Sequence, residues 1–183
     1  MEIMRLVVAG HVGAGKSTFI RSISEIEVVD TDCQATDETA LIKDKTTVAF
    51  DFGKLQFSPD MMLHLYGTPG QERFDFLWEM LITKAHAYIL LVAAHKSEEF
   101  SFARRIASYM NQAAQIPMII GLTHTDNPGA WSEENIAIAL GYTDEQRPPI
   151  VTVNPNQTAS VVEALISLVQ HYTQSSLSQE ITV

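Results

Sequence analysis

Residues 10–17 read Gly10-His11-Val12-Gly13-Ala14-Gly15-Lys16-Ser17, a complete match to the pattern G-x-x-x-x-G-K-[ST]. The preceding residues 3–9 form a short apolar run, as a buried strand would, and residues 17–23 carry apolar side chains at helical spacing. A glycine-rich loop between a strand and a helix points backbone N–H groups at phosphate oxygens, and the helix adds its positive N-terminal end. The stretch therefore predicts a loop that binds the phosphates of a nucleotide.

The residue types within this loop indicate separate roles. Lys16 is long enough to reach the β- and γ-phosphates, and the hydroxyl of Ser17 is a ligand for Mg²⁺. We interpret the side chain of His11 as exposed on the surface of the loop and not as a catalytic base. The predicted phosphate-binding residues are His11, Val12, Gly13, Ala14, Gly15, Lys16, Ser17 and Thr18.

The composition is that of a globular protein, with 46% apolar and 19% charged residues, and a length of 183 residues fits one domain over residues 1–183. The formal net charge of −10 argues against binding nucleic acid through a broad surface field. No apolar run approaches the roughly 20 residues of a membrane span, and no lipidation motif is present, so we expect no direct membrane anchor. The single cysteine, Cys33, suits a reducing cytoplasm.

Apolar and amphipathic runs alternate along the chain, which predicts an α/β fold. Strands joined by the short turn at residues 58–60 should pair antiparallel, and the other connections are long enough for helices. We therefore expect a six-stranded, mostly parallel sheet with one antiparallel strand and about five helices on both faces. Ser160 and Glu163 resemble a capping box at the start of the last helix. The expected strands are residues 3–9, 47–57, 61–66, 87–94, 117–123 and 149–153, and the expected helices are residues 17–23, 74–83, 97–114, 132–140 and 158–175.

A second distinctive stretch follows the third expected strand, where residues 66–74 read Tyr66-Gly67-Thr68-Pro69-Gly70-Gln71-Glu72-Arg73-Phe74. Together with the phosphate loop, it resembles the second switch, D-x-x-G-Q-E, of the Ras-like small GTPases. The bacterial MglA-like branch, including conservon-type small GTPases, has the most similar pattern, with a proline before the switch glycine and an Asp-Phe pair in the second strand (here Asp51-Phe52). The resemblance implies the P-loop NTPase fold of a small G domain, with its first switch at about residues 30–47 and its second at about residues 67–77.

This placement fits the hydrolysis of GTP to GDP and phosphate, which needs a positioned water and donors for the developing charge. By the resemblance, Gln71 would orient the water, and the N–H of Gly70 would bind the γ-phosphate. Lys16 would stabilise charge on the phosphates. The predicted catalytic residues are Gln71, Lys16 and Gly70.

The predicted metal site departs from the family pattern. Ras-like proteins have an aspartate three residues before the switch glycine, and this chain has Gly67 there. Asp51 on the neighbouring strand is either its substitute or an ordinary acid at the edge of the sheet. For the threonine of the first switch, Thr47 matches best and Thr46 is the alternative. The predicted Mg²⁺ ligands are Ser17, Thr47 and Asp51.

The base-recognition motif also departs from its pattern, N-K-x-D. Thr123-His124-Thr125-Asp126 follows an apolar strand, and Asp126 is placed to accept hydrogen bonds from guanine. Thr123 can keep a hydrogen bond that tethers the loop, and His124 can stack on the base in place of the lysine. In the last loop Pro155 has no N–H, so Asn154 or Asn156 must supply the donor to the guanine oxygen. The predicted base-binding residues are Thr123, His124, Asp126 and Asn154.

The sequence thus indicates a cytoplasmic small GTPase that binds GTP and GDP with Mg²⁺ and acts as a molecular switch. Val12 is a branched residue where many relatives have glycine, so it either crowds Gln71 and slows hydrolysis in the absence of a partner, or a shifted second switch leaves room. The resemblance implies a roadblock-type regulator or GAP and an unidentified effector as partners. The alternatives are a nucleotide-gated scaffold with little or no hydrolysis, and a P-loop ATPase or kinase.

Overall fold

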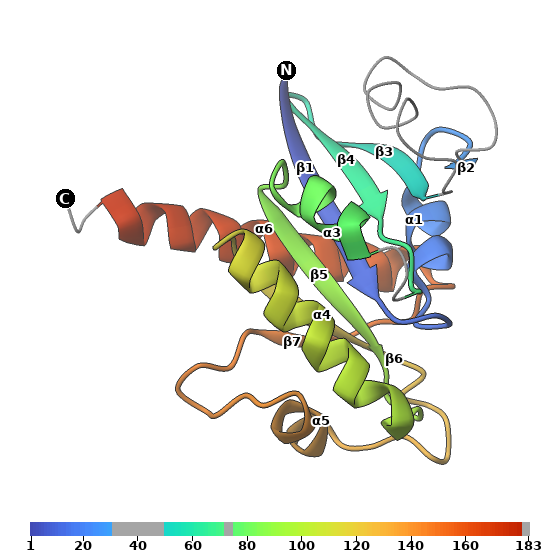
Figure 1. Cartoon of the computed structure of the whole chain (residues 1–183). Helices are drawn as coiled ribbons and strands as arrows, with labels where there is room; N and C mark the ends of the chain where they lie inside the picture. The colour runs from blue at the N-terminus through green and yellow to red at the C-terminus, as the bar shows by residue number, and fades with distance from the viewer. Residues whose placement is uncertain (31–49, 72–74, 181–183) are drawn as a thin grey trace.

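The computed structural model describes residues 1–30, 50–71 and 75–180. Its strands form one sheet in the order β2-β3-β4-β1-β5-β6-β7 (Figure 1). β3 runs antiparallel to both of its neighbours, and every other neighbouring pair is parallel. The strands are β1 (Glu2–Gly10), β2 (Val29–Asp30), β3 (Asp51–Ser58), β4 (Met61–Gly67), β5 (Ala87–Ala93), β6 (Met118–Thr123) and β7 (Ile150–Thr152).

The six predicted strands are therefore present, with the one antiparallel strand where the short turn placed it. The seventh strand of the described residues, β2, was not predicted, because its two residues are too few to carry a periodic pattern. It pairs Val29 with Phe52 at the outer edge of the sheet. Residues 47–49, the predicted beginning of the second strand, lie outside the described residues.

Five helices occur in the described residues, as predicted, and they cover both faces of the sheet. They are α1 (Lys16–Ile23), α3 (Asp75–Ile82), α4 (Phe100–Ala113), α5 (Glu133–Ala139) and α6 (Thr158–Glu180), with a short 3₁₀ turn (Ser97–Glu99) before α4. Figure 1 shows α3 and α4 in front of the sheet and α6 behind it.

The two faces correspond to two apolar clusters. Along β1, Val7 and Ala9 pack with residues of α3, α4 and α5 on one side, and Leu6 and Val8 pack with residues of α1 and α6 on the other. This alternation is the two-residue period of a strand that is buried on both faces. All four of these side chains are fully buried, so burial of apolar surface holds β1 at the centre of the sheet.

α6 begins at Thr158, as predicted, but Ser160 does not cap it. The hydroxyl of Ser160 accepts the backbone N–H of Asn154 at 2.9 Å, and the helix begins two residues earlier, at Thr158. The predicted capping box is therefore wrong: the preceding loop takes the serine that would cap the helix. Ser160 thus fixes the loop that follows β7.

The order of the strands places the ends of β1, β5 and β6 side by side, all pointing the same way. Ligands of open α/β sheets bind at this edge. Among the described residues, no helix combines the length and the apolar character that crossing a membrane requires.

Candidate nucleotide-binding site

The phosphate loop joins the end of β1 to the first turn of α1, as the sequence predicts. Gly15, directly before the helix, has a φ of +102°, in the left-handed region that favours glycine. A Cβ at Gly15 would lie 2.8 Å from Cγ of Pro155, so the loop after β7 packs directly on the phosphate loop. No side chain fits at this point, and the two loops hold each other in place.

Lys16 lies at the centre of the loop. Its side chain is buried, and Nζ donates hydrogen bonds to the carbonyl oxygens of Gly10 at 2.8 Å and His11 at 2.7 Å. Burial lowers the pKa of Lys16 to about 8, and the nearby carboxylate of Asp51 opposes this shift. The loop therefore curls around an ammonium group whose charged form a bound phosphate would stabilise.

His11 is fully buried, so its interpretation as a surface side chain is wrong. The backbone N–H of Ala93 in β5 donates to its Nε2 at 3.3 Å, and its Nδ1 lies 2.9 Å from the carbonyl oxygen of Val12. Because Nε2 must accept, Nδ1 carries the proton and donates to Val12. Burial lowers the pKa of His11, which favours this neutral form. His11 thus attaches the phosphate loop to β5.

At one end of the loop, the hydroxyl of Ser17 donates to Oδ2 of Asp51 at 2.5 Å. A Cβ at Gly67 would lie 3.2 Å from Cβ of Asp51 and 3.4 Å from its Oδ2, so the carboxylate of Asp51 lies beside the position where the family pattern has an acid. These two side chains, together with Lys16, line a cavity of about 320 Å³. We refer to this cavity as the metal end.

A hydroxyl and a carboxylate fit Mg²⁺, which prefers oxygen ligands and is held in nucleotide sites by one or two side chains, phosphates and water. No cluster of three or more His, Cys, Asp or Glu side chains suited to a metal occurs in the described residues. The third predicted ligand, Thr47, and its alternative, Thr46, lie outside those residues.

The segment after β4 lies against the phosphate loop. The buried indole of Trp78 donates to the carbonyl oxygen of Pro69 at 3.0 Å, which fixes the residue before the predicted switch glycine. A Cβ at Gly70 would lie 2.7 Å from the backbone nitrogen of Val12, so Gly70 is in close backbone contact with the loop. Gln71, the predicted water-orienting residue, follows as an exposed residue, and residues 72–74 lie outside the described part.

At the other end, Thr123 is buried at the end of β6, and its hydroxyl donates to the carbonyl oxygen of Ala14 at 2.9 Å. This is the tether expected of the residue that replaces the motif asparagine. Because the hydroxyl proton is used, Nδ1 of His124, 3.0 Å away, donates to the same oxygen. His124 has a φ of +57° and packs against His95, with ring centroids 4.8 Å apart.

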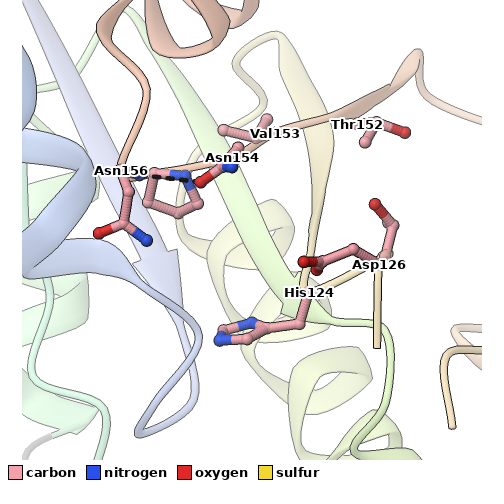
Figure 2. A pocket seen from close by; sticks show the side chains of 8 residues that line it. His124, Asp126, Thr152, Val153, Asn154 and Asn156 are labelled. Atoms are coloured by element: carbon pink, nitrogen blue, oxygen red, sulfur yellow. Dashed lines mark hydrogen bonds between the residues drawn. The ribbon is translucent and has the colours of Figure 1, made fainter. Parts of the chain in front are cut away.

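A cavity of about 250 Å³ lies beside this loop and is called the base end here; Figure 2 shows His124 and Asp126 on one side of it and Asn154 and Asn156 on the other. The backbone N–H of Asn154 is used by Ser160, and that of Asn156 donates to Oδ1 of Asn154 at 3.1 Å. Both backbone donors expected for the base are therefore already bonded. The remaining donor of Asn154 is its side-chain amide nitrogen.

Residues 5–126, more than half of the chain, match the family described as Roc, the Ras of Complex domain of DAPkinase. The chain belongs to the Roc family. Roc domains are Ras-like GTPase domains, so the coarser resemblance to Ras-like small GTPases is confirmed. The match covers the phosphate loop, the segment after β4 and the base motif.

Two further similarities accompany this Roc match. An uncharacterized protein of Methanocaldococcus jannaschii is 28% identical over 94 residues, which is 51% of this chain and 53% of that protein; the chain thus spans about half the length of this relative. The structure of the Arl6 (BBS3) small GTPase from Trypanosoma brucei, with the bound nucleotide analogue GppNp, covers 94% of this chain and 99% of its own at a TM-score of 0.73. At 16% identity, this second similarity shows the shared fold of a small GTPase.

Sequence reasoning missed two residues that shape the site of this Roc-family chain. Ser160 carried a local capping signal that pointed to the wrong partner, although its contact with Asn154 fixes the base end. His11 carried no signal for burial, because its contact with Ala93 joins strands that are distant in sequence. The contact of His11 depends on the order of the strands, whereas that of Ser160 joins residues only six apart in the sequence.

Proposed function

We propose that the chain is a guanine-nucleotide-dependent molecular switch, folded as one domain over residues 1–183, with its switches at about residues 30–47 and 67–77. One observation carries the proposal. The metal end and the base end lie on opposite sides of a single phosphate loop, with Ser17 and Asp51 at one and Asp126 at the other. A nucleoside triphosphate has the same order of parts, with a charged tail joined to a flat base.

At the metal end, Ser17 and Asp51 would hold Mg²⁺ together with Thr47 of the first switch. The hydrogen bond from Ser17 to Asp51 supports this assignment over an unrelated acid at the edge of the sheet, because it already brings the two oxygen ligands together. Bound Mg²⁺ would neutralise charge on the β- and γ-phosphates. Lys16 and the N–H groups of residues 11–18 would bind the same phosphates.

At the base end, the carboxylate of Asp126 would accept hydrogen bonds from the ring N–H and the amino group of guanine. Adenine lacks this donor pair, so the contact would discriminate between the bases. Thr123 holds the loop on Ala14, His124 would stack on the base, and the side-chain amide of Asn154 would donate to the guanine oxygen.

We also propose that the chain hydrolyses GTP, with Gln71 orienting the water, Gly70 binding the γ-phosphate and Lys16 stabilising charge. The close contact between Gly70 and Val12 favours slow hydrolysis in the absence of a partner. Following the resemblance to the MglA-like and conservon-type branch, the partners would be a roadblock-type regulator or GAP and an effector, in the cytoplasm. The same contact supports the second candidate function, a nucleotide-gated scaffold with little hydrolysis.

The nucleotide that copurifies with the chain tests the proposal. We expect GDP or GTP, identified by chromatography after denaturation, and GTP should displace a fluorescent GDP analogue far better than ATP. A Lys16→Ala variant should lose the bound nucleotide. Preference for ATP would contradict the base assignment, and phosphate release measured with and without cell lysate would separate the switch from the scaffold.

A further inference from the structure

The base motif of this chain lacks its lysine, and His124 stands there instead. The ring of His124 donates to Thr123 and packs on His95. Partial burial and the neighbouring His95 lower its pKa, while Asp126 opposes the shift, so the neutral imidazole is favoured at neutral pH. Residue 124 therefore does not supply the positive charge of the motif lysine.

A different lysine lies at this place in the fold. β5 is the strand between β1, which carries the phosphate loop, and β6, which carries the base motif. Lys96 is the third residue after the end of β5 at Ala93, and its backbone N–H donates to the carbonyl oxygen of Ala93, so the chain turns at the edge of the sheet. The order of the strands therefore places Lys96 between the two loops.

The ammonium group of Lys96 lies against the phosphate loop. Its Nζ is 3.1 Å from the point that a Cβ of Gly13 would occupy, and Gly13 has a φ of +80°, which glycine adopts without strain. A side chain at position 13 would displace the ammonium. The absence of a side chain there is what lets the positive charge approach the backbone of the loop.

The charge of Lys96 reaches both loops. It contributes to lowering the pKa of His11, in the phosphate loop, and that of His124, in the base loop. Within residues 1–30, 50–71 and 75–180, no acidic side chain forms a salt bridge with Lys96. An ammonium group held between two ligand-binding loops without such a partner is suited to an anionic ligand.

We propose that Lys96 is a nucleotide-binding residue that takes the place of the missing motif lysine and donates to oxygens of the ribose–phosphate segment between the metal end and the base end. This inference rests on the proposed function. Lys96 lines neither the cavity of the metal end nor that of the base end, and its ammonium lies beside Gly13 of the phosphate loop. We therefore place its contact on the part of the ligand that GDP and GTP share. Both nucleotides should therefore gain affinity from it equally.

The test is the affinity of the full chain, in Mg²⁺, for fluorescent GDP and for a fluorescent, non-hydrolysable GTP analogue. We expect Lys96→Met to weaken both by on the order of tenfold, the size of one charge-assisted hydrogen bond. The matched control is Lys84→Met, which removes the same charge from an exposed position between α3 and β5 and should change neither affinity. Equal affinities for Lys96→Met and Lys84→Met would overturn the inference, as would a loss confined to the triphosphate.

A second variant tests whether Lys96 takes the place of the lysine that the base motif lacks. Returning lysine to the motif, as His124→Lys in the Lys96→Met background, should recover most of the lost affinity for both nucleotides. A loss that His124→Lys leaves unchanged would show that Lys96 does not occupy the place of the motif lysine. Thermal unfolding of each variant checks that it is folded. If Lys96→Met unfolds, Lys96→Gln, which also removes the charge but keeps a polar end, replaces it in the comparison with Lys84→Met and should weaken both nucleotides to a similar extent.

The two proposals fail differently. A folded wild-type chain that binds neither fluorescent nucleotide contradicts the proposed function, and this inference with it. Wild-type binding that survives Lys96→Met contradicts this inference alone.

Discussion

The metal end and the base end depart from the family pattern in a similar way, but they are built differently. At the metal end the pattern residue is absent, since Gly67 has no side chain, and Asp51 of the adjacent strand lies in the space with its carboxylate bonded to Ser17. At the base end a different residue, His124, fills the pattern position, and our inference assigns the missing cation to Lys96, which follows the adjacent strand and lies beside Gly13. In both cases a neighbouring strand supplies the charge.

The difference lies in what holds each charge. Asp51 is fixed by a hydrogen bond inside the protein, so the metal end is organised before a ligand arrives. Lys96 has no salt bridge within the described residues, so under our inference its ionic contact would form only with a bound nucleotide. We therefore expect the loss of the Asp51 charge at the metal end to have a larger effect than the loss of a charged group at the base end.

The largest effect is expected for Asp51→Asn, which keeps an oxygen acceptor for Ser17 but removes the charge. Affinity for GDP in the presence of Mg²⁺ should fall about 10- to 100-fold, as for other losses of a residue that supports a metal ligand. In EDTA the variant and the wild type should bind alike. Release of a fluorescent GDP analogue, measured with and without Mg²⁺, gives both values.

Two further variants make this test specific. Asp60→Asn removes an exposed carboxylate at the turn between β3 and β4 and should have no effect. Gly67→Asp restores the acid of the family pattern, and in the Asp51→Asn background it should recover part of the Mg²⁺-dependent affinity. A Cβ at Gly67 meets Cδ1 of Ile20 at 2.9 Å, and this flexible end of a side chain can move. If the GDP affinity of Asp51→Asn depends on Mg²⁺ as that of the wild type does, Asp51 is an ordinary acid at the edge of the sheet and not a metal ligand.

At the base end, Asp126→Asn should weaken GDP binding by roughly tenfold, because guanine then keeps a donor without its acceptor. The affinity for ADP should change little, so the preference for guanine narrows. Competition of GDP and ADP against a fluorescent nucleotide measures the preference. Asp144→Asn, in the exposed loop before β7, is the matched control. An unchanged preference of Asp126→Asn for GDP over ADP would show that Asp126 does not recognise the base.

A third prediction concerns His11, the buried side chain that attaches the phosphate loop to β5. Its pKa is lowered in the folded state by burial, with Lys16 and Lys96 adding to the shift and Glu99 and the bond to Val12 opposing it. The unfolded chain therefore takes up a proton near the ordinary pKa of 6.5, before the folded chain does. The stabilisation is complete above that pH and is lost as the pH falls through the lowered pKa.

The expected loss of stability is about 1 kcal/mol, the size of one hydrogen bond. Thermal unfolding between pH 8 and pH 5 measures it, and His11→Gln should have a shallower pH dependence than the wild type. His171→Gln, on the partly exposed surface of α6, is the control and should retain the wild-type slope. Identical slopes for His11→Gln and the wild type would exclude His11 as the titrating group.

The features that the sequence predicted are those in which neighbours along the chain are also neighbours in space. The phosphate loop is one such feature, since its strand, glycines and helix are contiguous, and the antiparallel pair around residues 58–60 is another. The assignment of Thr123 as a tether also succeeded, because its strand ends beside the phosphate loop whatever the exact register.

Apart from the local contact of Ser160 with Asn154, the features that were missed depend on strand pairings that a single sequence does not contain. The sequence left Asp51 with two interpretations and did not show that it lies beside Gly67, which depends on the register of β3 on β4. His11 is buried only because β5 lies next to β1, and Lys96 reaches Gly13 for the same reason. In each case the decisive contact joins residues at the ends of two neighbouring strands. The local sequence pattern identifies the residue, but it does not identify the residue that it contacts.

The smallest effect is expected for Val12→Gly, which tests how the metal end is connected to hydrolysis. Val12 is 56% exposed and lines the metal end together with Gly70, the residue before Gln71. If it crowds the attacking water, Val12→Gly should raise the single-turnover rate of GTP hydrolysis by roughly threefold, about 0.6 kcal/mol in the barrier. Val12→Thr, which keeps the branched shape, should hydrolyse GTP at the wild-type rate. No gain with Val12→Gly would reject crowding and favour the arrangement in which the second switch leaves room.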